Sequence, residues 1–224
     1  MLALLTVVLT VLSVVQAFNQ HPLFSVLKLV ILLGVGAGIV MDGITLSTSS
    51  PQKISLRSDL LDFFAVAAGA MITFIINTEF GTGAVTASAV VGLAGGIFFR
   101  RQAAAVFCGS FAGMSSPELL TLVPGMLLAA LLAGLIYVAV KDSFAGIGGK
   151  LGTTAYAGCL IASLVLSCRP VGQPVPSWDI GWIIMLYAAA GAAAAYILNH
   201  RMRAGPVIAS AIVGLSAGIV LPII

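Results

Sequence analysis

The sequence predicts an all-α polytopic membrane protein with about nine transmembrane helices, arranged as two inverted four-helix repeats joined by a short linking helix. Three observations lead to this prediction. The first is composition: only 8% of the 224 residues are charged and 60% are hydrophobic, with a mean hydropathy of +1.17. A soluble domain carries about 25% charged residues, and a chain of this size cannot hide so much apolar surface from water. The other two are an internal duplication and a one-sided distribution of basic residues.

The duplication relates segments that lie 122 residues apart. "GAVTASAVVGLAGGI" at 83–97 and "GPVIASAIVGLSAGI" at 205–219 agree at ten of fifteen positions without a gap. At the same offset, "AAGAMITFIIN" at 67–77 aligns with "AAGAAAAYILN" at 189–199. The chain is therefore interpreted as two copies of one four-helix unit.

Each repeat contains four apolar segments near the length of about 20 residues that a membrane helix needs. We expect helices at 1–18, 23–45, 59–77 and 83–99 in the first repeat, 1–101, and at 118–140, 147–168, 178–199 and 204–223 in the second, 118–224. The opening segment lacks the basic start of a signal peptide, so it is expected to span the membrane. The linking segment, 102–117, has no counterpart in the first repeat.

Basic residues indicate whether the linking segment crosses the membrane. If it does not cross, the ten Lys and Arg residues divide five to five between the two sides. If it crosses, eight share one side: Lys53, Arg57, Arg100, Arg101, Lys141, Lys150, Arg201 and Arg203, with Lys28 and Arg169 opposite. The positive-inside rule favours the second arrangement. It places the N-terminus in the cytoplasm and the C-terminus outside, expected at a bacterial inner membrane, and it inverts one repeat relative to the other.

The linking segment is too short to be an ordinary membrane helix. A helix over 103–114 covers about 18 Å at 1.5 Å per residue, against a hydrocarbon core of about 30 Å. The "SSPE" that follows at 115–118 is a helix-start signal, with a serine cap and proline in the first turn. Three alternatives remain open: a loop at the far headgroup layer, a helix break at membrane depth, or a re-entrant loop.

The stretch "SFAGIGGKLGTT" at 143–154 places a lysine at the start of a predicted helix. Lys150 is either an anchor whose ammonium extends to the membrane edge or part of a site for a small anion or an organic carboxylate. Thr153, Thr154 and free backbone N–H groups beside it would suit such a ligand. Lys28 occupies the matching position of the first repeat.

The duplicated glycine-rich segments carry small residues at every fourth position. Ser88, Gly92 and Gly96 form one series, and Ser210, Gly214 and Gly218 form the other. This spacing is typical of membrane helices that pack backbone to backbone. We therefore predict that the two helices meet each other, or equivalent partners, around a pseudo-twofold axis. The alternative is that their serines line a path, and such ridges also favour a homo-oligomer in lipid.

Few other polar residues indicate chemistry. Asp59 and Asp62 are expected to be solvated charges near Lys53 and Arg57; the alternative is that Asp62 lies inside the bilayer as a proton or cation site. Cys108, Cys159 and Cys168 are interpreted as small apolar residues rather than a disulfide or metal set. No basic run indicates nucleic acid, and no metal or cofactor motif occurs.

The sequence favours transport over catalysis. No hydrolase or metalloprotease motif occurs, although a Ser–Lys dyad of Ser110 or Ser116 with Lys150 stays open. The first hypothesis is a secondary carrier or carrier-like channel for a small solute or ion, which binds between the repeats. The alternative is a non-transporting membrane scaffold or a subunit of a larger complex. The candidate substrate-binding residues are Lys150, Gly149, Thr153, Thr154, Ser110, Ser115, Ser116, Ser88 and Ser210.

Overall fold

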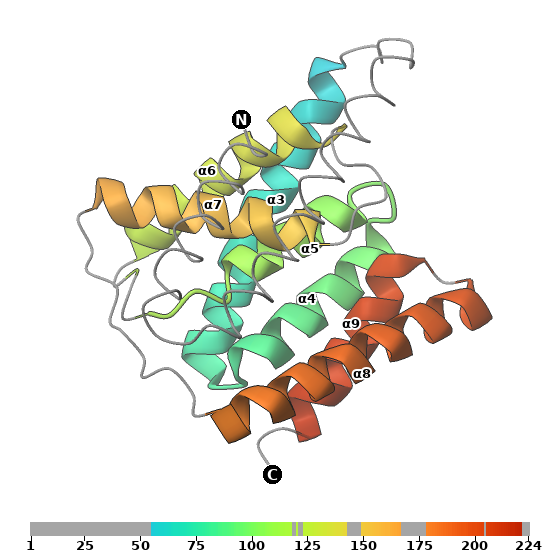
Figure 1. Cartoon of the computed structure of the whole chain (residues 1–224). Helices are drawn as coiled ribbons and strands as arrows, with labels where there is room; N and C mark the ends of the chain where they lie inside the picture. Colours follow the sequence, from blue (N-terminus) through green and yellow to red (C-terminus); the bar gives the residue numbers. More distant parts are fainter. Residues whose placement is uncertain are drawn as a thin grey trace, which may run out of the picture.

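The computed structural model describes residues 55–117, 120, 123–142, 149–166, 178–203 and 205–220. The described residues form seven α-helices and no strand (Figure 1), which confirms the predicted all-α class. The predicted helices at 1–18 and 23–45 lie outside the described residues, as do Lys28, Lys53, Cys168 and Arg169.

Helix bounds follow the predicted segments closely at most positions. The helices are α3 (Leu56–Phe80), α4 (Ala84–Phe98), α5 (Ala103–Ala112), α6 (Val123–Val140), α7 (Lys150–Val165), α8 (Trp178–Met202) and α9 (Pro206–Val220). Two of these, α3 and α6, are long and apolar enough to cross a membrane. Four shorter apolar helices accompany them: α4, α5, α7 and α9.

The predicted start of the helix over 118–140 lies outside the described residues, which omit 118, 119, 121 and 122. Beside these positions, the Leu120 N–H donates to the Ser116 carbonyl at 3.1 Å, and helix α6 is described from Val123 onward.

The duplication extends to the helix bounds and to the turn between the helices. Adding 122 to the bounds of α3 and α4 gives the bounds of α8 and α9. The turns agree as well: Gly81 and Gly83 have φ angles of 59° and 84°, and their equivalents Arg203 and Gly205 have 51° and 93°. Two segments that differ in many side chains therefore form similar helical hairpins, with positive φ angles at the same two turn positions.

Helices α3, α5, α6 and α7 share one buried core. The core is built from small residues and a few larger ones, such as Val66, Leu120 and Met126. Close approach depends on glycine: a Cβ on Gly158 of α7 would lie 2.6 Å from the Ala133 backbone nitrogen of α6. Such backbone-to-backbone packing is how helices associate where lipid removes the hydrophobic driving force.

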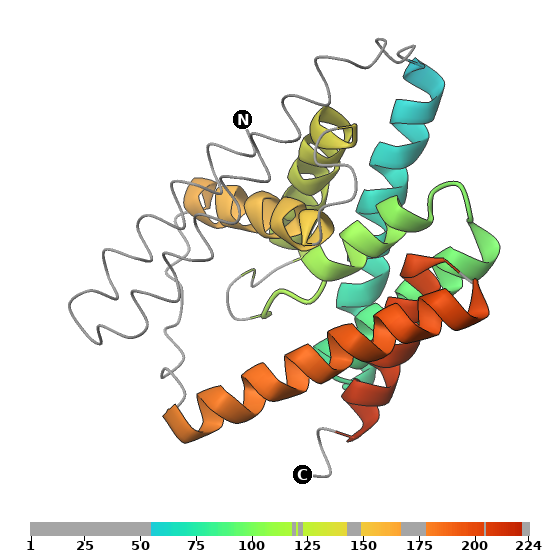
Figure 2. The same cartoon turned by 45° about the vertical axis from the view of Figure 1, so that its right-hand side comes forward.

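Helix α4 connects this core to the second hairpin. It packs against α3 and α5 on one side and α9 on the other, while α8 packs against α9 (Figure 2). Helices α4 and α9 are antiparallel: a Cβ on Gly96 would meet Ile208, and one on Gly218 would meet Thr86. These two contacts are equivalent under the 122-residue offset. The predicted packing of the two glycine-rich helices against each other is confirmed.

The basic residues that the structure describes gather at one end of the bundle. Arg57 begins α3, and Lys141 after α6 pairs with Asp59 on the first turn of α3. Lys150 donates to the Lys141 carbonyl. The turn at 81–83 reverses the chain, so α4 runs back to the end where α3 begins. Arg100 and Arg101 follow α4 and therefore lie at that same end. Arg201 and Arg203 precede α9, whose first turn packs on the last turn of α4.

Large apolar side chains cover the outside of the helices. Examples from four helices are Phe64, Phe98, Leu135 and Leu186, with exposed fractions between 58% and 76%. Monomeric soluble proteins rarely expose apolar surface on this scale. The outer surface is therefore of the kind that faces lipid or a protein partner.

Candidate functional site

Helix α5 ends inside the bundle, surrounded by α3, α4, α6 and α7 (Figure 2). Its ten residues cover about 15 Å, half of a hydrocarbon core. Glycines allow the contact with α3: a Cβ on Gly109 would overlap the Val66 carbonyl, and one on Gly113 would lie 2.7 Å from Thr73 Cβ. The half-length helix predicted for the linking segment is therefore present, and it is enclosed by protein.

The chain leaves helical geometry directly after α5. The Gly113 N–H makes the last α-helical bond, to the Gly109 carbonyl at 3.0 Å. The next two N–H groups, of Met114 and Ser115, reach only the carbonyls three residues back, at 3.3 and 3.1 Å. Gly113 is buried and Ser116 is exposed, so the break leads from the interior of the bundle to its surface. Irregular backbone at membrane depth is tolerated where protein or a wet cavity surrounds it.

Two hydroxyl groups border the break. Ser115 Oγ lies 2.8 Å from the Ala112 carbonyl oxygen and 3.1 Å from Cys159 Sγ of α7. Thr73 of α3 is fully buried, and its Oγ1 has no hydrogen-bond partner among the described residues. Sequence reasoning selected Ser115 but missed Thr73, because the lack of a partner is visible only in the folded chain.

A second pair of hydroxyl groups joins α5 to α4. Ser88 and Ser110 are both buried, and their oxygens lie 2.9 Å apart. Ser110 also donates to the Phe107 carbonyl of its own helix. The structure therefore brings together two of the predicted site residues and gives them partners. Ser210, the equivalent of Ser88, is partly buried on α9.

The predicted anion-binding group lies at the first turn of α7. Gly149 caps the helix with a φ of 84°. The hydroxyls of Thr153 and Thr154 donate to the carbonyls of Gly149 and Lys150, within the same turn. The Lys150 ammonium donates to the carbonyl of Lys141 at the end of α6. These groups are adjacent as predicted, and each makes a bond within the protein.

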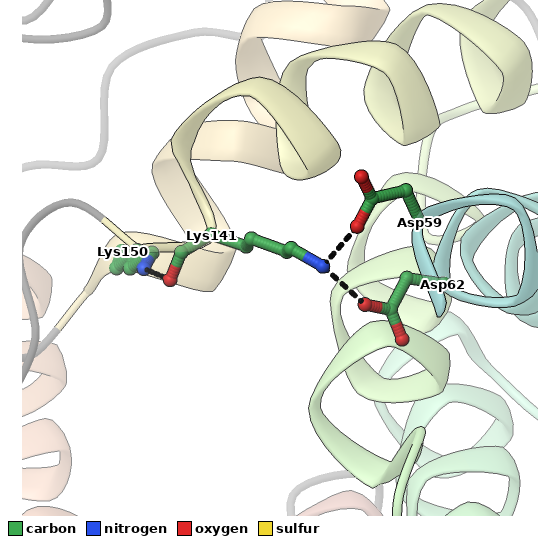
Figure 3. A network of polar contacts seen from close by, with 4 residues as sticks. All are labelled: Asp59, Asp62, Lys141 and Lys150. Carbon is green, nitrogen blue, oxygen red and sulfur yellow. Dashed lines mark hydrogen bonds and ion pairs between the residues drawn. The ribbon is translucent and has the colours of Figure 1, made fainter. Parts of the chain in front are cut away.

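A cluster of charges lies beside this turn (Figure 3). The Lys141 ammonium pairs with both Asp59 and Asp62, the second at 3.2 Å. The expectation that the two aspartates are solvated charges is wrong, since their side chains are 20% and 13% exposed. The hydrogen bond that the Lys141 ammonium donates to Asp59 raises the pKa of Lys141, against the opposing effect of burial. The spacing of three residues, which places both carboxylates on one face of a helix, was the available signal.

The helix ends favour this charge arrangement. Asp59 lies in the first turn of α3, where the helix dipole stabilises a negative charge, and Lys141 follows the last residue of α6, where it stabilises a positive one. The cluster therefore holds together one end of α3 and one end of α6. It stabilises the bundle and places the start of α3 and the end of α6 on the same side of it.

The cysteines of the described region are not a reactive pair. Cys108 and Cys159 are buried and free, as the sequence predicted for small apolar residues. The Cys108 thiol donates to the Leu151 carbonyl at 3.4 Å. Ser110 bonds Ser88 and its own helix, so the pairing of Ser110 with Lys150 that a dyad requires is not formed.

No protein-family model, curated protein or solved structure matches this chain. The arrangement itself therefore carries the functional argument. It offers buried hydroxyls near a helix break, with the basic groups of the described region gathered at one end of the bundle.

Proposed function

We propose that this protein is an integral membrane transporter, a secondary carrier or carrier-like channel, for a small solute or ion. The solute or ion binds at the interface of two inverted repeats. The observation that carries the proposal is the break after α5. A half-length helix ends among four others and leaves hydroxyls and carbonyls in the interior. Binding sites in inverted-repeat transporters are typically built from such discontinuous helices.

The inverted repeat has its own support. The hairpins α3–α4 and α8–α9 have equivalent bounds, and α4 and α9 pack antiparallel through equivalent contacts. Antiparallel packing of equivalent helices is what two copies of opposite orientation would produce in a membrane. The clustering of the described basic residues at one end fits the positive-inside rule and a cytoplasmic location for that end. Nine crossings and an inner-membrane location complete the proposal.

The solute site is proposed at the α5 break, with Ser115 and the Ser88–Ser110 pair as its polar lining. The anion hypothesis at Lys150 remains a separate part of the proposal, because its ammonium and both threonine hydroxyls already donate to main-chain carbonyls. An anionic solute would have to compete with those bonds. A Lys150→Gln protein that binds an anionic solute normally would overturn this part.

A thermal-shift screen of ions and small metabolites on the purified protein tests the proposal. A true ligand at one hundred times its Kd stabilises the folded state by about 2.7 kcal/mol. Each hit is then tested for flux in proteoliposomes. Ser115→Ala should reduce the shift, whereas Ser216→Ala should not. Ser216 is a matched control, because it is exposed on α9 and makes the same bond to a carbonyl three residues back. A flat screen with no flux would favour the scaffold alternative.

A further inference from the structure

Four arginines gather at one end of the α4–α9 contact. Helices α4 and α9 lie side by side (Figure 1), and a Cβ on Gly96 of α4 would lie 2.6 Å from Ile208 of α9. Arg101 follows Gly96 by five residues and Arg203 precedes Ile208 by five. Because the helices are antiparallel, both arginines lie beyond the same end of the pair. We call the following four residues the arginine patch: Arg100, Arg101, Arg201 and Arg203.

The positive charge of the arginine patch is not neutralised within the described part of the chain. All four residues are exposed. Among the described residues, no hydrogen bond or ion pair involves one of their guanidinium groups. The ion pairs that the described residues do form belong to Lys141, which pairs with Asp59 and Asp62. Like charges held close together repel one another, so the patch favours an anionic partner.

The internal repeat shows that the hairpin does not need these charges in order to fold. At the 122-residue offset, the residues that match the patch are Glu79, Gly81, Pro222 and Ile223. Arg203 has a φ of 51°, in a region that glycine adopts without steric cost and that Gly81 adopts at 59°. Such strain in a non-glycine residue is typical of positions where the side chain has a function. The second hairpin therefore keeps an arginine where glycine would suit the backbone better.

The short helices hold the patch at the depth of lipid headgroups in the proposed membrane. Helices α4 and α9 have 15 residues each, which cover about 22 Å against a hydrocarbon core of about 30 Å. Arginines at the ends of such helices extend their side chains into the headgroup layer. Large apolar side chains adjoin them: Phe98 and Phe99 are 76% and 60% exposed, and Tyr196 and Ile197 are 73% and 58% exposed. Charged and apolar groups thus meet at one place on the surface, as they do in a phospholipid.

We propose that the arginine patch binds the headgroup of an anionic phospholipid, such as phosphatidylglycerol. Guanidinium groups suit a phosphodiester, because each donates two parallel N–H bonds to its oxygens. A headgroup bound by arginines that follow α4 and precede α9 joins the two hairpins where they meet. An acidic protein segment would match the charge but would leave the adjoining apolar side chains uncovered. The lipid site rests on the proposed membrane location and does not depend on transport.

The test measures the melting temperature of the purified full chain in detergent at low ionic strength, after removal of native lipid. Phosphatidylglycerol should raise the melting temperature along a saturable curve. Phosphatidylcholine with the same acyl chains should not, because it has no net charge. Inorganic phosphate should not reproduce the curve, since it cannot contact the apolar side chains beside the patch. Equal curves for the two lipids, or a curve that phosphate reproduces, overturn the proposal.

Arg203→Gly separates lipid binding from stability. Without lipid, this variant should melt at least as high as the wild type, because glycine relieves the strained backbone. Its phosphatidylglycerol midpoint should nevertheless rise about fivefold, the effect of removing one basic residue from an anionic membrane surface. Arg100→Gln combined with Arg101→Gln should raise the midpoint further. An Arg203→Gly protein with the wild-type midpoint overturns the proposal, and the double variant decides if Arg203→Gly fails to fold.

Arg57→Gln is the matched control. Arg57 is an exposed arginine at the same end of the bundle, but it lies at the start of α3 and outside the patch. The variant should keep the wild-type phosphatidylglycerol midpoint. A shift equal to that of Arg203→Gly would show that total charge, and not the patch, attracts the lipid, and it would overturn the proposal.

The two proposals fail separately. Melting that depends on phosphatidylglycerol, with a flat solute screen and no flux, would leave the lipid site standing and remove the transport function. Solute-dependent melting and flux with equal curves for both lipids would do the reverse.

Discussion

At a helix crossing, a glycine allows two backbones to approach closely because it has no Cβ. Gly158 of α7 faces the backbone of Ala133 on α6. On Gly152 of the same helix, an added Cβ would meet no atom of the described residues within 4 Å. The two residues differ in what lies opposite them. They therefore separate the packing role of glycine from its intrinsic effect on helix stability.

Gly158→Ala should destabilise the protein by about 1–3 kcal/mol, because the added methyl cannot fit without moving backbone. Gly152→Ala should instead stabilise it by up to about 1 kcal/mol, the difference in helix propensity. Melting temperatures of the two variants in one detergent check the prediction. Similar shifts of the same sign would contradict the proposed α6–α7 contact.

Arg203 is strained where its equivalent is not. It has a φ of 51°, in the left-handed region, while the same position of the first hairpin is Gly81. A side chain in this region costs roughly 1–2 kcal/mol. Arg203→Gly should therefore raise the melting temperature. Gly81→Ala, whose methyl would meet no described atom within 4 Å, should lower it through backbone strain alone. The two substitutions should shift the melting temperature in opposite directions. A lower melting temperature for Arg203→Gly would instead indicate that the arginine side chain has a separate stabilising role.

At the scale of elements, contacts between helix ends stabilise the bundle in addition to contacts between helix faces. Lys141 joins the end of α6 to the start of α3 through two carboxylates. Its pKa is raised by the Asp59 hydrogen bond. A lysine whose pKa is raised in the folded state contributes stability that is fully present below its unfolded pKa, about 10.4. That contribution disappears as the pH rises through the folded value.

Lys141→Gln should lower stability by about 1 kcal/mol near neutral pH, the upper range for partly exposed pairs. The difference from the wild type should stay constant between about pH 7 and pH 9.5 and shrink above about pH 10.5. Melting curves across this range check the prediction. Asp59→Asn combined with Lys141→Gln should cost less than the sum of the single changes, and additivity would show that the pair is not coupled.

The elements differ in how far the sequence could predict them. Apolar length and the 122-residue repeat were sufficient for α3, α4, α7, α8 and α9 within a few residues, and small residues at every fourth position predicted the α4–α9 contact. The helix start predicted from the serine–proline signal stays a prediction, because 118 and 119 lie outside the described residues. Lys141 and Asp59 are 82 residues apart, so no local pattern joins them. Thr73 was missed for the same reason: its hydroxyl is exceptional only once α5 lies against α3.

At the scale of the whole molecule, the inverted arrangement makes a prediction about equivalent positions. Glu79 and Arg201 are related by the 122-residue offset and are both exposed, near the ends of α3 and α8. If the repeats are inverted, cysteines introduced at these two positions should face opposite compartments. A membrane-impermeant thiol reagent added to spheroplasts should label Glu79→Cys and not Arg201→Cys.

Both positions should react once the membrane is opened, which controls for the reactivity of each cysteine. Fluorescent and phosphatase fusions at the two chain ends should likewise report opposite compartments. Labelling of both introduced cysteines from the same side in intact spheroplasts would show that the copies run parallel. The solute path between inverted repeats would then have no basis.

The α4–α9 contact also imposes an order on folding. Gly96 and Ile208, which meet in that contact, are separated by 112 residues of chain. At a translation rate of about 5–20 residues per second, the ribosome needs on the order of ten seconds between synthesising one and the other. Throughout that interval the glycine face of α4 remains without its partner helix. A nascent chain stalled before α9 should therefore be the form most readily captured by insertion chaperones.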